Sequence, residues 1–582
     1  MPYLPTMPTQ QTVRDVTDVF YGYNHQAQIG GGEFYEMENL SSDNFPLMSP
    51  RKPRGLVLWN VNVQGMTELA GKLAYVQDGT LWYADKATPV SGLGEGRKQM
   101  VCMGAYICIF PDKVYYNTAD ESDYGSMEAE YSSTGTIKYK LCKADGTVYE
   151  KKPTVSDTAP AEPQNGDLWL DSSGESYSLK IYSSSLVQWA TVPTVYTRIE
   201  FISSGEIPKL FKEHDGVSIS GSSIADVNGE KIIYALGVGE GADYIVVANI
   251  LKEAAEQTTG FISIKRSVPE MDYICESQNR LWGCYFGKSG DVTLNEIYCC
   301  ALGDFKNWRQ YMGLSTDSWT ASVGADGEWT GAVNYMGYPM FFKETAILRV
   351  GVSNTGAHSI NETAARGVQS GCAESLCVVN ETLYYKARGA VCAYQGGFPS
   401  SVSEPLGAEE YHDAAAGALA DKYYIEMTNA GGDRYLFVYD LKRGLWMKET
   451  ALRAWRFTEA KGELYALTET GMECLIGSKG RKEPYVSWSA ESGMLYYQYP
   501  DKKYVSRYNL RIEMQPGAEM KIYIQYDSGK WELKGFVEYK GTGTVTLPIW
   551  ARRCDHMRLR FVGKGDFKIY SIAKILEIGS DM

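Results

Sequence analysis

Histidine is the side chain most often used for metal binding and for proton transfer near neutral pH, and it is sparse in this chain. The five histidines are His25, His214, His358, His412 and His556, and no two lie within five residues of each other. Zinc sites usually take at least two ligands at close spacing. The sequence therefore predicts no metal site.

The sequence carries no complete catalytic or cofactor-binding motif. His412-Asp413 has no Gly-x-Ser-x-Gly elbow to accompany it, so a polar loop between strands is the favoured interpretation. The glycine-rich stretches at 30–32, 92–96 and 237–241 match neither the dinucleotide motif nor the P-loop, and no predicted helix follows them. We expect no catalytic residues, no cofactor and no enzymatic activity.

Aromatic and sulfur-bearing side chains offer other chemistry. Trp169 and Trp189 share one short segment, where they form either a glycan-stacking surface or the small core of a β module, and the core is favoured. The twelve cysteines contain no Cys-x-x-Cys pair, and several, such as Cys102 and Cys108, have apolar neighbours. Buried free thiols of a protein made in a reducing compartment are the expected result.

The elements that must position these residues are predicted to be short strands. The 582 residues include 59 glycines, 43 tyrosines and 13 tryptophans, which favour turns and half-buried pleated strands. Hydrophobic residues make up 44%, enough for a core, which excludes bulk disorder. Short helical patterns occur at 250–257 and 414–420. We expect neither a membrane-spanning segment nor a signal peptide.

A loose repeat of strand, turn and strand recurs, for example at 69–85, 103–118, 375–397 and 459–477. Units of about 40 to 50 residues with four strands are typical of β-propeller blades, which bury by radial stacking the faces that a single sheet leaves open. Two units precede residue 119 and about five lie between 270 and 480, which predicts six or seven blades. A stacked β-sandwich assembly is the alternative.

The pattern divides this all-β chain into six parts. An extended N-terminal segment (1–68) joins the propeller, whose blades occupy 69–118 and 269–483. Two insertions separate the blades: a linker with a small β module at 119–196 and a barrel-like β module at 197–268. A C-terminal β-sandwich of jelly-roll character spans 484–582.

Three segments carry a resemblance to known proteins. FYGYNHQAQIGGGEFYEMENLSSDNFPLMSPRKPRG, at 20–55, resembles the opening of virion proteins from phages and prophages of gut Firmicutes. Its passage into a basic Arg-Pro segment is similar to the nozzle, or tail tubular, proteins of short-tailed phages and to packaged-DNA-stabilisation proteins. The segments 160–192 and 215–249 resemble small modules of phage tail proteins and of such propellers.

The resemblance implies a structural virion protein of a phage tail, assembled in the host bacterial cytoplasm. It would form a homo-oligomeric ring, with a hexamer favoured, that closes and gates the DNA exit channel beside portal, adaptor or tail proteins. The formal charge of 57 − 71 = −14 fits a wall along which DNA passes without sequence-specific binding, because acidic surfaces repel phosphates. The candidate subunit contacts are Arg51, Lys52, Arg54, Arg552 and Arg553.

Two alternatives stay open. The first is a tail-tip or fibre-associated protein that binds host surface glycan, with Trp169 and Trp189 as the stacking candidates. The second is a carbohydrate-active enzyme on a propeller fold.

Overall fold

The computed structural model describes residues 11–202, 205–239, 242–353, 356–495, 502–538, 541–549 and 552–578. Within these ranges the regular structure is almost entirely β, which confirms the all-β prediction. The helical elements are α1 (Ile207–Leu210) and the 3-10 turns η1 (Ser42–Asn44), η2 (Ala225–Val227), η3 (Ala373–Ser375) and η4 (Glu404–Leu406). No helix in the described ranges has the length and apolar character needed to cross a membrane.

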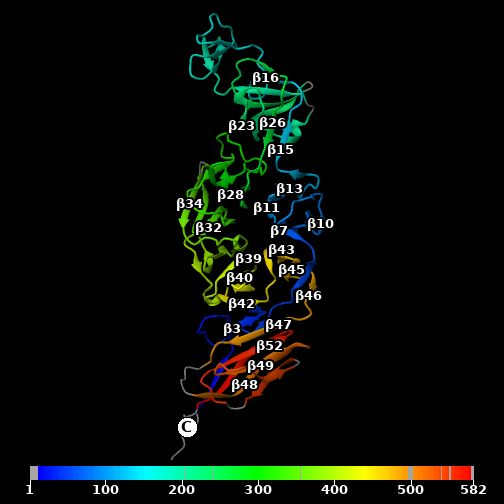
Figure 1. The fold of residues 1–582 in the computed structure, drawn as a ribbon, viewed down its shortest axis with the longest axis vertical. Helices are drawn as coiled ribbons and strands as arrows, with labels where there is room; N and C mark the ends of the chain where they lie inside the picture. Colours follow the sequence, from blue (N-terminus) through cyan, green and yellow to red (C-terminus); the bar gives the residue numbers. More distant parts are fainter. Residues whose placement is uncertain are drawn as a thin grey trace, which may run out of the picture.

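Seven antiparallel sheets of the described chain make up its middle part, here called the sheet ring (Figure 1). Six have four strands that follow one another in chain order, and the seventh has the order β43-β44-β45-β6-β46. Their strands are β7 (Val63–Leu69), β8 (Lys72–Gln77), β9 (Thr80–Tyr83), β10 (Lys86–Ala87), β11 (Gln99–Met103), β12 (Tyr106–Phe110), β13 (Val114–Asn117), β14 (Tyr124–Ser126), β27 (Tyr273–Ser277), β28 (Arg280–Ser289), β29 (Val292–Cys299), β30 (Trp319–Ser322), β31 (Gly331–Tyr335), β32 (Tyr338–Lys343), β33 (Ala346–Val352), β34 (His358–Ala364), β35 (Cys377–Val379), β36 (Thr382–Ala387), β37 (Ala390–Tyr394), β38 (Ser400–Ser401), β39 (Tyr411–Leu419), β40 (Lys422–Asn429), β41 (Arg434–Asp440), β42 (Leu445–Glu449), β43 (Ala454–Ala460), β44 (Glu463–Thr468), β45 (Gly471–Ile476), β6 (Gly55–Trp59) and β46 (Arg481–Lys482).

The first strands of these sheets contact one another in a closed circuit. β7 contacts β11, β11 contacts β27, and β27 contacts β31; η3, which leads into β35, links β31 to the following sheets. β35 contacts β39, β39 contacts β43, and β43 returns to β7. Because β6 comes from the N-terminal segment and pairs with β45, the two ends of the circuit are joined within one sheet.

Turn chemistry explains how the local hairpins of the ring form. Gln77 pairs with Thr80 across a two-residue loop, in which Asp78 has φ 49° and Gly79 has φ 73°. Two successive residues with positive φ match the twist of paired strands, and Asp-Gly is a favoured sequence for such a loop. The hairpin buries Val76 and Leu81 completely in the core between neighbouring sheets.

The insertion between β14 and β27 contains two sheets. The larger has the order β15-β26-β22-β23-β24-β21-β16-β25, and the smaller has the order β17-β18-β19-β20. Their strands are β15 (Ala129–Ser132), β16 (Ile137–Cys142), β17 (Thr154–Ser156), β18 (Leu168–Asp171), β19 (Ser178–Ser183), β20 (Gln188–Thr191), β21 (Tyr196–Phe201), β22 (Gly216–Ser220), β23 (Gly229–Gly239), β24 (Ala242–Ala248), β25 (Ala255–Gln257) and β26 (Ser263–Arg266).

The expected division of the insertion at residues 196 and 197 is therefore wrong. The two modules are nested, because β16 pairs with β21 and Cys142 lies opposite Tyr196. The small module interrupts the larger sheet instead of preceding it. Leu168, Leu170 and Leu179 of the small module share a buried core with the larger sheet.

The C-terminal part is a pair of sheets with one shared core, here called the sheet pair. One sheet has the order β1-β53-β48-β51 and the other has the order β2-β3-β47-β52-β49-β50. The strands are β1 (Gln11–Thr17), β2 (Gly22–Tyr23), β3 (Glu33–Glu38), β47 (Ser487–Ser492), β48 (Lys503–Met514), β49 (Glu519–Tyr526), β50 (Glu532–Val537), β51 (Gly541–Pro548), β52 (Met557–Lys564) and β53 (Phe567–Ile578), with β4 (Leu40–Ser41) and β5 (Ser49–Pro50) forming a separate small ladder.

Alternation along the strands creates the core of the sheet pair. Ile522 and Ile524 on β49 and Leu510 and Ile512 on β48 are all buried in one cluster, as expected when every second side chain points inward. The N-terminal segment 1–68 is more than the extended connection that the sequence predicted, because β1, β2 and β3 belong to these two sheets.

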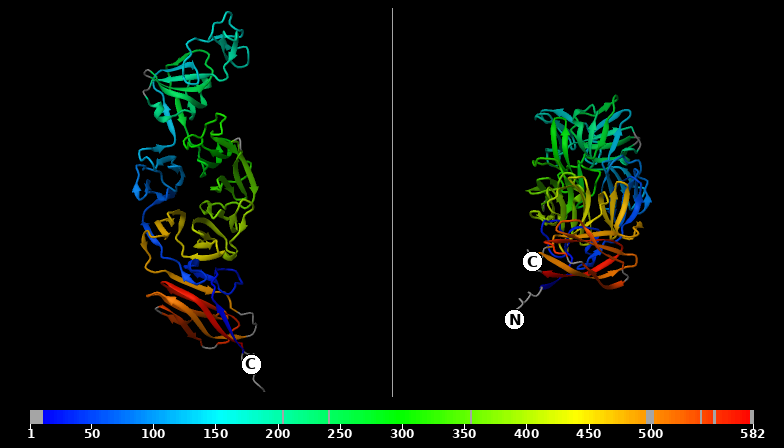
Figure 2. Two further views of the ribbon diagram at one scale, coloured as in Figure 1. Left: turned by 180° about the vertical axis from the view of Figure 1, so that it is seen from behind. Right: turned by 60° about the horizontal axis from the view of Figure 1, so that its bottom comes forward.

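The parts follow one another along an elongated molecule. Figures 1 and 2 show the sheet pair at one end, the sheet ring in the middle and the inserted sheets at the other end. The N-terminal segment runs between the sheet pair and the ring, and therefore lies where the two parts meet.

Candidate functional site

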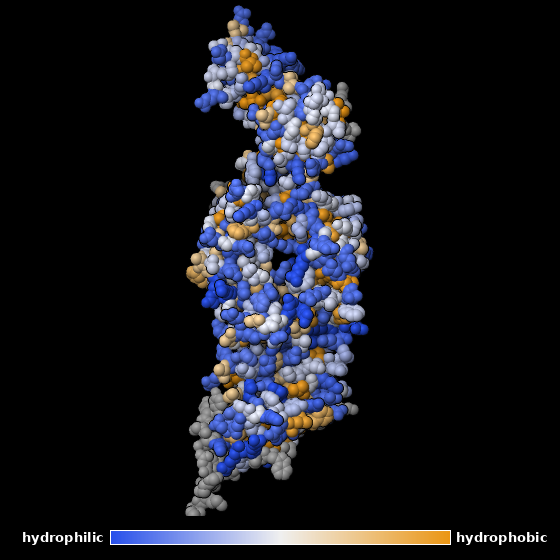
Figure 3. Space-filling view, viewed as in Figure 1, coloured by the Kyte–Doolittle hydropathy of each residue, from blue (hydrophilic) through white to orange (hydrophobic). Residues whose placement is uncertain are grey.

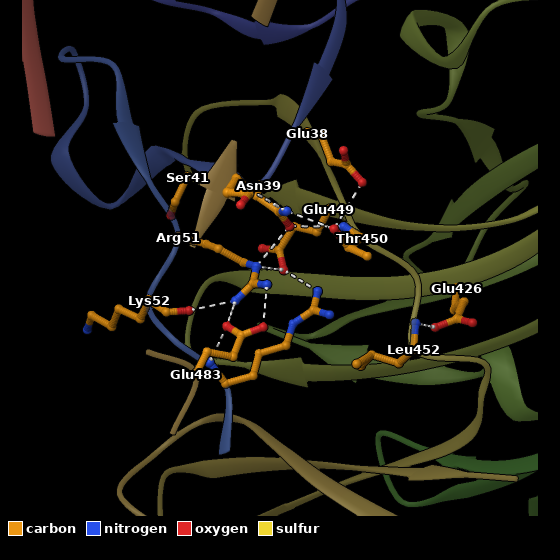
Figure 4. Close-up of polar contacts among 12 residues, drawn as sticks. Glu38, Asn39, Ser41, Arg51, Lys52, Glu426, Glu449, Thr450, Leu452 and Glu483 are labelled. Atoms are coloured by element: carbon orange, nitrogen blue, oxygen red, sulfur yellow. Dashed lines mark hydrogen bonds and ion pairs between the residues drawn. The ribbon is translucent and has the colours of Figure 1, made fainter. Parts of the chain in front are cut away.

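A buried cluster of charged residues lies where the N-terminal segment meets the ring and the sheet pair (Figure 4). Arg51 donates two parallel hydrogen bonds to Glu483, with Nη1–Oε2 and Nη2–Oε1 distances of 2.7 and 3.1 Å. Arg54 donates from Nη2 to Oε2 of Glu449 at 2.8 Å. Arg51 and Arg54 are only 8% and 4% exposed. Bidentate, charge-assisted bonds of this kind fix both position and orientation.

Asn39 connects this cluster to three parts of the chain. Its side-chain oxygen accepts a hydrogen bond from Arg51 Nε at 2.9 Å and another from the Thr450 amide at 3.0 Å. Its Nδ2 donates to Thr450 Oγ1 at 2.7 Å and to the Ser487 carbonyl at 2.8 Å. Thr450 follows β42 of the ring and Ser487 begins β47, so one amide ties the N-terminal segment to both bodies.

The electrostatics of Glu483 follow from its partners. Burial by itself would raise the pKa of this carboxyl. The hydrogen bonds from the Arg51 side chain and the Arg54 amide, together with the two positive charges, outweigh that effect and lower the pKa below its ordinary value. Glu483 therefore stays ionised as the partner of Arg51.

These positions change the interpretation of the predicted subunit contacts. Arg51 and Arg54 are buried and bind partners within the chain, so their side chains do not lie on a surface that a neighbouring subunit could reach. Lys52, Arg552 and Arg553 are exposed. Arg552 binds Glu532 at 3.0 Å and lies over the ring of Tyr526.

The predicted stacking residues lie in the small inserted module. Trp169 is only 6% exposed, and its Nε1 donates to the Ser156 carbonyl at 3.1 Å. Trp189 is half-buried and packs edge-on against Trp169, with ring centroids 5.5 Å apart. Trp169 is thus part of a small core, and a glycan could not stack on its face while Lys180 lies 4.4 Å above the ring.

The structure also locates the histidine and cysteine residues that were considered in the sequence. His412 lies 3.4 Å from Asp413 through its Nε2, at the irregular start of β39. All twelve cysteines are free thiols and ten of them are buried, as the sequence predicted for the thiols themselves. In the part of the chain that the structure describes, no group of three or more histidine, cysteine, aspartate or glutamate side chains has the geometry for a metal ion.

The first strands of the ring carry a further ion pair. Arg456 on β43 donates from Nη1 to both carboxylate oxygens of Glu374, at 2.9 and 2.7 Å, and from Nε to the Met66 carbonyl of β7 at 2.7 Å. These contacts therefore link η3, β43 and β7 at the point where the circuit of strands closes. The space-filling view shows a hollow near the middle of the ring (Figure 3).

Two hollows with measured volumes lie elsewhere. One, of about 720 Å³, is lined by Asp43, Lys52, Tyr485 and neighbours from the N-terminal segment and the sheet pair. The other, of about 670 Å³, lies between the larger inserted sheet and β29–β30 of the ring. No pattern in the sequence predicted the second hollow. Alternation of Leu294, Glu296 and Tyr298 marks one face of a strand, but nothing local shows what lies opposite that face.

The chain was also compared with known proteins. No family model matches the sequence, and no curated protein matches it. Among solved structures, it resembles PorZ of the type-IX secretion system of Porphyromonas gingivalis at 11% identity, covering 90% of this chain and 82% of that one with a TM-score of 0.25.

Two glycosidase structures are similarly distant. An exo-β-1,3-galactanase from Phanerochaete chrysosporium matches at 8% identity, with 70% and 92% of the two chains covered and a TM-score of 0.19. A Trypanosoma rangeli sialidase matches at 8% identity, with 97% and 96% covered and a TM-score of 0.25.

Proposed function

We propose that the seven sheets are the blades of a single β-propeller, and that the sheet pair is a β-sandwich appended to it. The circuit of first strands supports this proposal, as does β6, which joins the beginning of the chain to the last sheet. A ring closed in this way has no free end at which blades can separate, and it leaves only short edges.

The molecule then acts as a structural, non-enzymatic subunit of a phage tail nozzle. The observation that carries this proposal is the N-terminal segment, which gives strands to the sandwich and to the propeller. Between them it holds the half-buried Arg51–Glu483 pair and the buried Arg54–Glu449 pair. A nozzle subunit must keep its shape against the pressure of packaged DNA. Buried, paired charges resist separation, because pulling one partner away leaves the other uncompensated.

The net charge of the chain and two exposed cationic side chains also support the proposal. The net charge of −14 suits a channel wall that DNA passes without binding. Lys52, beside the hollow of about 720 Å³, and Arg552 are the side chains proposed to contact acidic surfaces of neighbouring subunits. The partners are other copies of this chain, with a hexamer favoured, and the adjoining portal, adaptor or tail proteins of the virion.

Light scattering and negative-stain microscopy of the full chain test the proposal. We expect a closed ring with a central pore, and we expect the double variant Lys52→Glu/Arg552→Glu to shift the population to single subunits that stay folded, as judged by thermal unfolding. Lys138→Glu, at an exposed lysine of the inserted sheet, is the matched control and should leave the ring intact. A chain that stays monomeric at every concentration, or a ring indifferent to both contact substitutions, would contradict the proposal.

A further inference from the structure

The hollow of about 670 Å³ between the inserted sheet and the ring has the features of a binding groove. β23 contributes Ile232 and Tyr234 on one side, and β29 contributes Glu296 and Tyr298 on the other. Tyr311, from the loop before β30, lines it as well and is 54% exposed. The volume lies within the range of roughly 300–1,000 Å³ that is usual for small-ligand sites.

The chemistry of the groove combines aromatic faces with polar groups. Tyr298 donates its hydroxyl to Glu296 Oε2 at 2.6 Å, and burial and this bond raise its pKa, which keeps the hydroxyl protonated. Glu230 on β23 and Arg309 in the ring loop before β30 form an ion pair between the two sides of the groove, with both side chains about half exposed. Each of these groups has hydrogen-bonding capacity left for a ligand, since a carboxylate accepts several bonds and a guanidinium donates five.

The groove is built on a fixed frame. Asn307 donates from Nδ2 to the His214 carbonyl at 2.9 Å and accepts from the Gly216 amide at 3.2 Å, which joins the loop of the ring to the inserted sheet. Asp317 accepts from the amides of Met312 and Leu314, at 2.5 and 3.0 Å, and so shapes the turn that carries Tyr311. A site formed before the ligand arrives loses less entropy on binding.

The balance of charge narrows the ligand class. The two lining carboxylates, Glu230 and Glu296, are matched by two cations, Lys231 and Arg309. A phosphate-rich ligand or nucleic acid would need an excess of cations, which the groove lacks. A sugar ring has an apolar face that packs on tyrosine and hydroxyl groups that bond to carboxylate and guanidinium groups at its edge.

We propose that this groove binds a neutral oligosaccharide, with Tyr311 and Tyr234 as stacking faces and Glu296 and Arg309 as hydrogen-bonding partners. The site differs from the Trp169–Trp189 pair and lies between the larger inserted sheet and the sheet of the ring that follows it in the chain. It does not depend on the proposed nozzle function, because oligomeric state and sugar binding are measured separately.

Binding of the full chain to an array of neutral di- to hexasaccharides of glucose, galactose and N-acetylhexosamine tests the proposal, followed by titration with the best binder. Tyr311→Ala is expected to weaken binding about tenfold, and Glu296→Gln by several-fold, since each removes one kind of contact. Tyr485→Ala, which truncates an equally exposed tyrosine (54%) outside the groove, should bind like the wild type. Thermal unfolding of each variant shows that it is folded.

Three results would overturn the proposal: no saturable binding of any neutral sugar, binding that survives the double variant Tyr311→Ala/Glu296→Gln, or binding confined to sulfated and phosphorylated probes. A second titration uses a purified bacterial surface polysaccharide. Binding that requires Tyr311 identifies such a surface glycan as the source, whereas binding that ignores Tyr311 counts against the groove.

Discussion

The ionisation of Glu483 makes the stability of the folded protein depend on pH. Its pKa is lowered in the folded protein, so its contribution to stability is fully present above the unfolded value near 4.5 and is lost as pH falls through the lower, folded value. We expect the stability difference between wild type and Glu483→Gln to shrink as pH falls from about 7 to below about 4. Thermal unfolding of both proteins across this pH range measures the difference.

Repeating the comparison in the Arg51→Gln background tests whether Arg51 causes this pH dependence. Without the guanidinium, the acid-dependent part of the Glu483→Gln effect should be much reduced, because Arg51 provides the strongest of the interactions that lower the pKa. An undiminished pH dependence in the Arg51→Gln background would show that other groups control Glu483.

At the scale of residues, the sequence identified the basic segment but not its environment. Arg51, Lys52 and Arg54 lie beside Pro50 and Pro53 in a segment that local patterns describe as exposed. Arg51 is buried because its partner, Glu483, comes from a strand-end 432 residues later in the chain. No local pattern contains that information.

At the scale of elements, β6 is the strand on which closure of the ring depends. Gly55 lies so close to the segment between β45 and β46 that a Cβ atom there would be 2.0 Å from the Lys479 carbonyl oxygen. Gly55→Ala should displace β6 and destabilise the protein by about 1–3 kcal/mol, the usual cost of overpacking a tight contact. Hydrogen exchange should then be faster in β6 and β45 than in β31 or β35.

Gly31→Ala is the matched control, because a Cβ atom at Gly31 meets nothing within 4 Å and the backbone there needs no positive φ. The two variants add the same methyl group to the N-terminal segment. Equal stability of the two would mean that the β6–β45 pairing does not hold the ring closed.

The two predictions that relied on local helix propensity alone were wrong. The alanine-rich stretch 414–420 was expected to form a helical turn, and most of it lies in strand β39. Its small side chains serve close packing: a Cβ atom on Gly417 would lie 2.5 Å from Cβ of Phe457 on the neighbouring β43. Similarly, Ala255–Gln257 forms β25 and pairs with β16, so contacts distant in sequence override helix propensity.

At the scale of the whole molecule, the insertion should be separable from the ring. Ala129 and Arg266 are paired across β15 and β26, so a short turn can replace residues 130–265. Outside this deletion, Lys113 still bonds to the Val268 carbonyl at 2.8 Å and to Glu128 at 3.1 Å. We expect a folded, soluble product with the ring and sheet pair intact, as judged by thermal unfolding.

The deletion also separates the two proposals. It removes one wall of the groove, so neutral sugar binding should disappear, while the oligomeric state set by Lys52 and Arg552 should not change. An insoluble or unfolded product would show that the ring needs the insertion to fold.

The sequence by itself determined the all-β class, the turn positions and the free thiols, because strand alternation, turn residues and apolar context are local properties. Tertiary structure decided which strands share a sheet: β6 with β45, β1–β3 with the C-terminal strands, and β16 with β21 around a nested module. It also decided that Arg51 and Arg54 are buried and that tyrosines from two modules face one groove. Those outcomes depend on contacts between segments that lie far beyond the range of a local sequence pattern, so period and composition do not encode them.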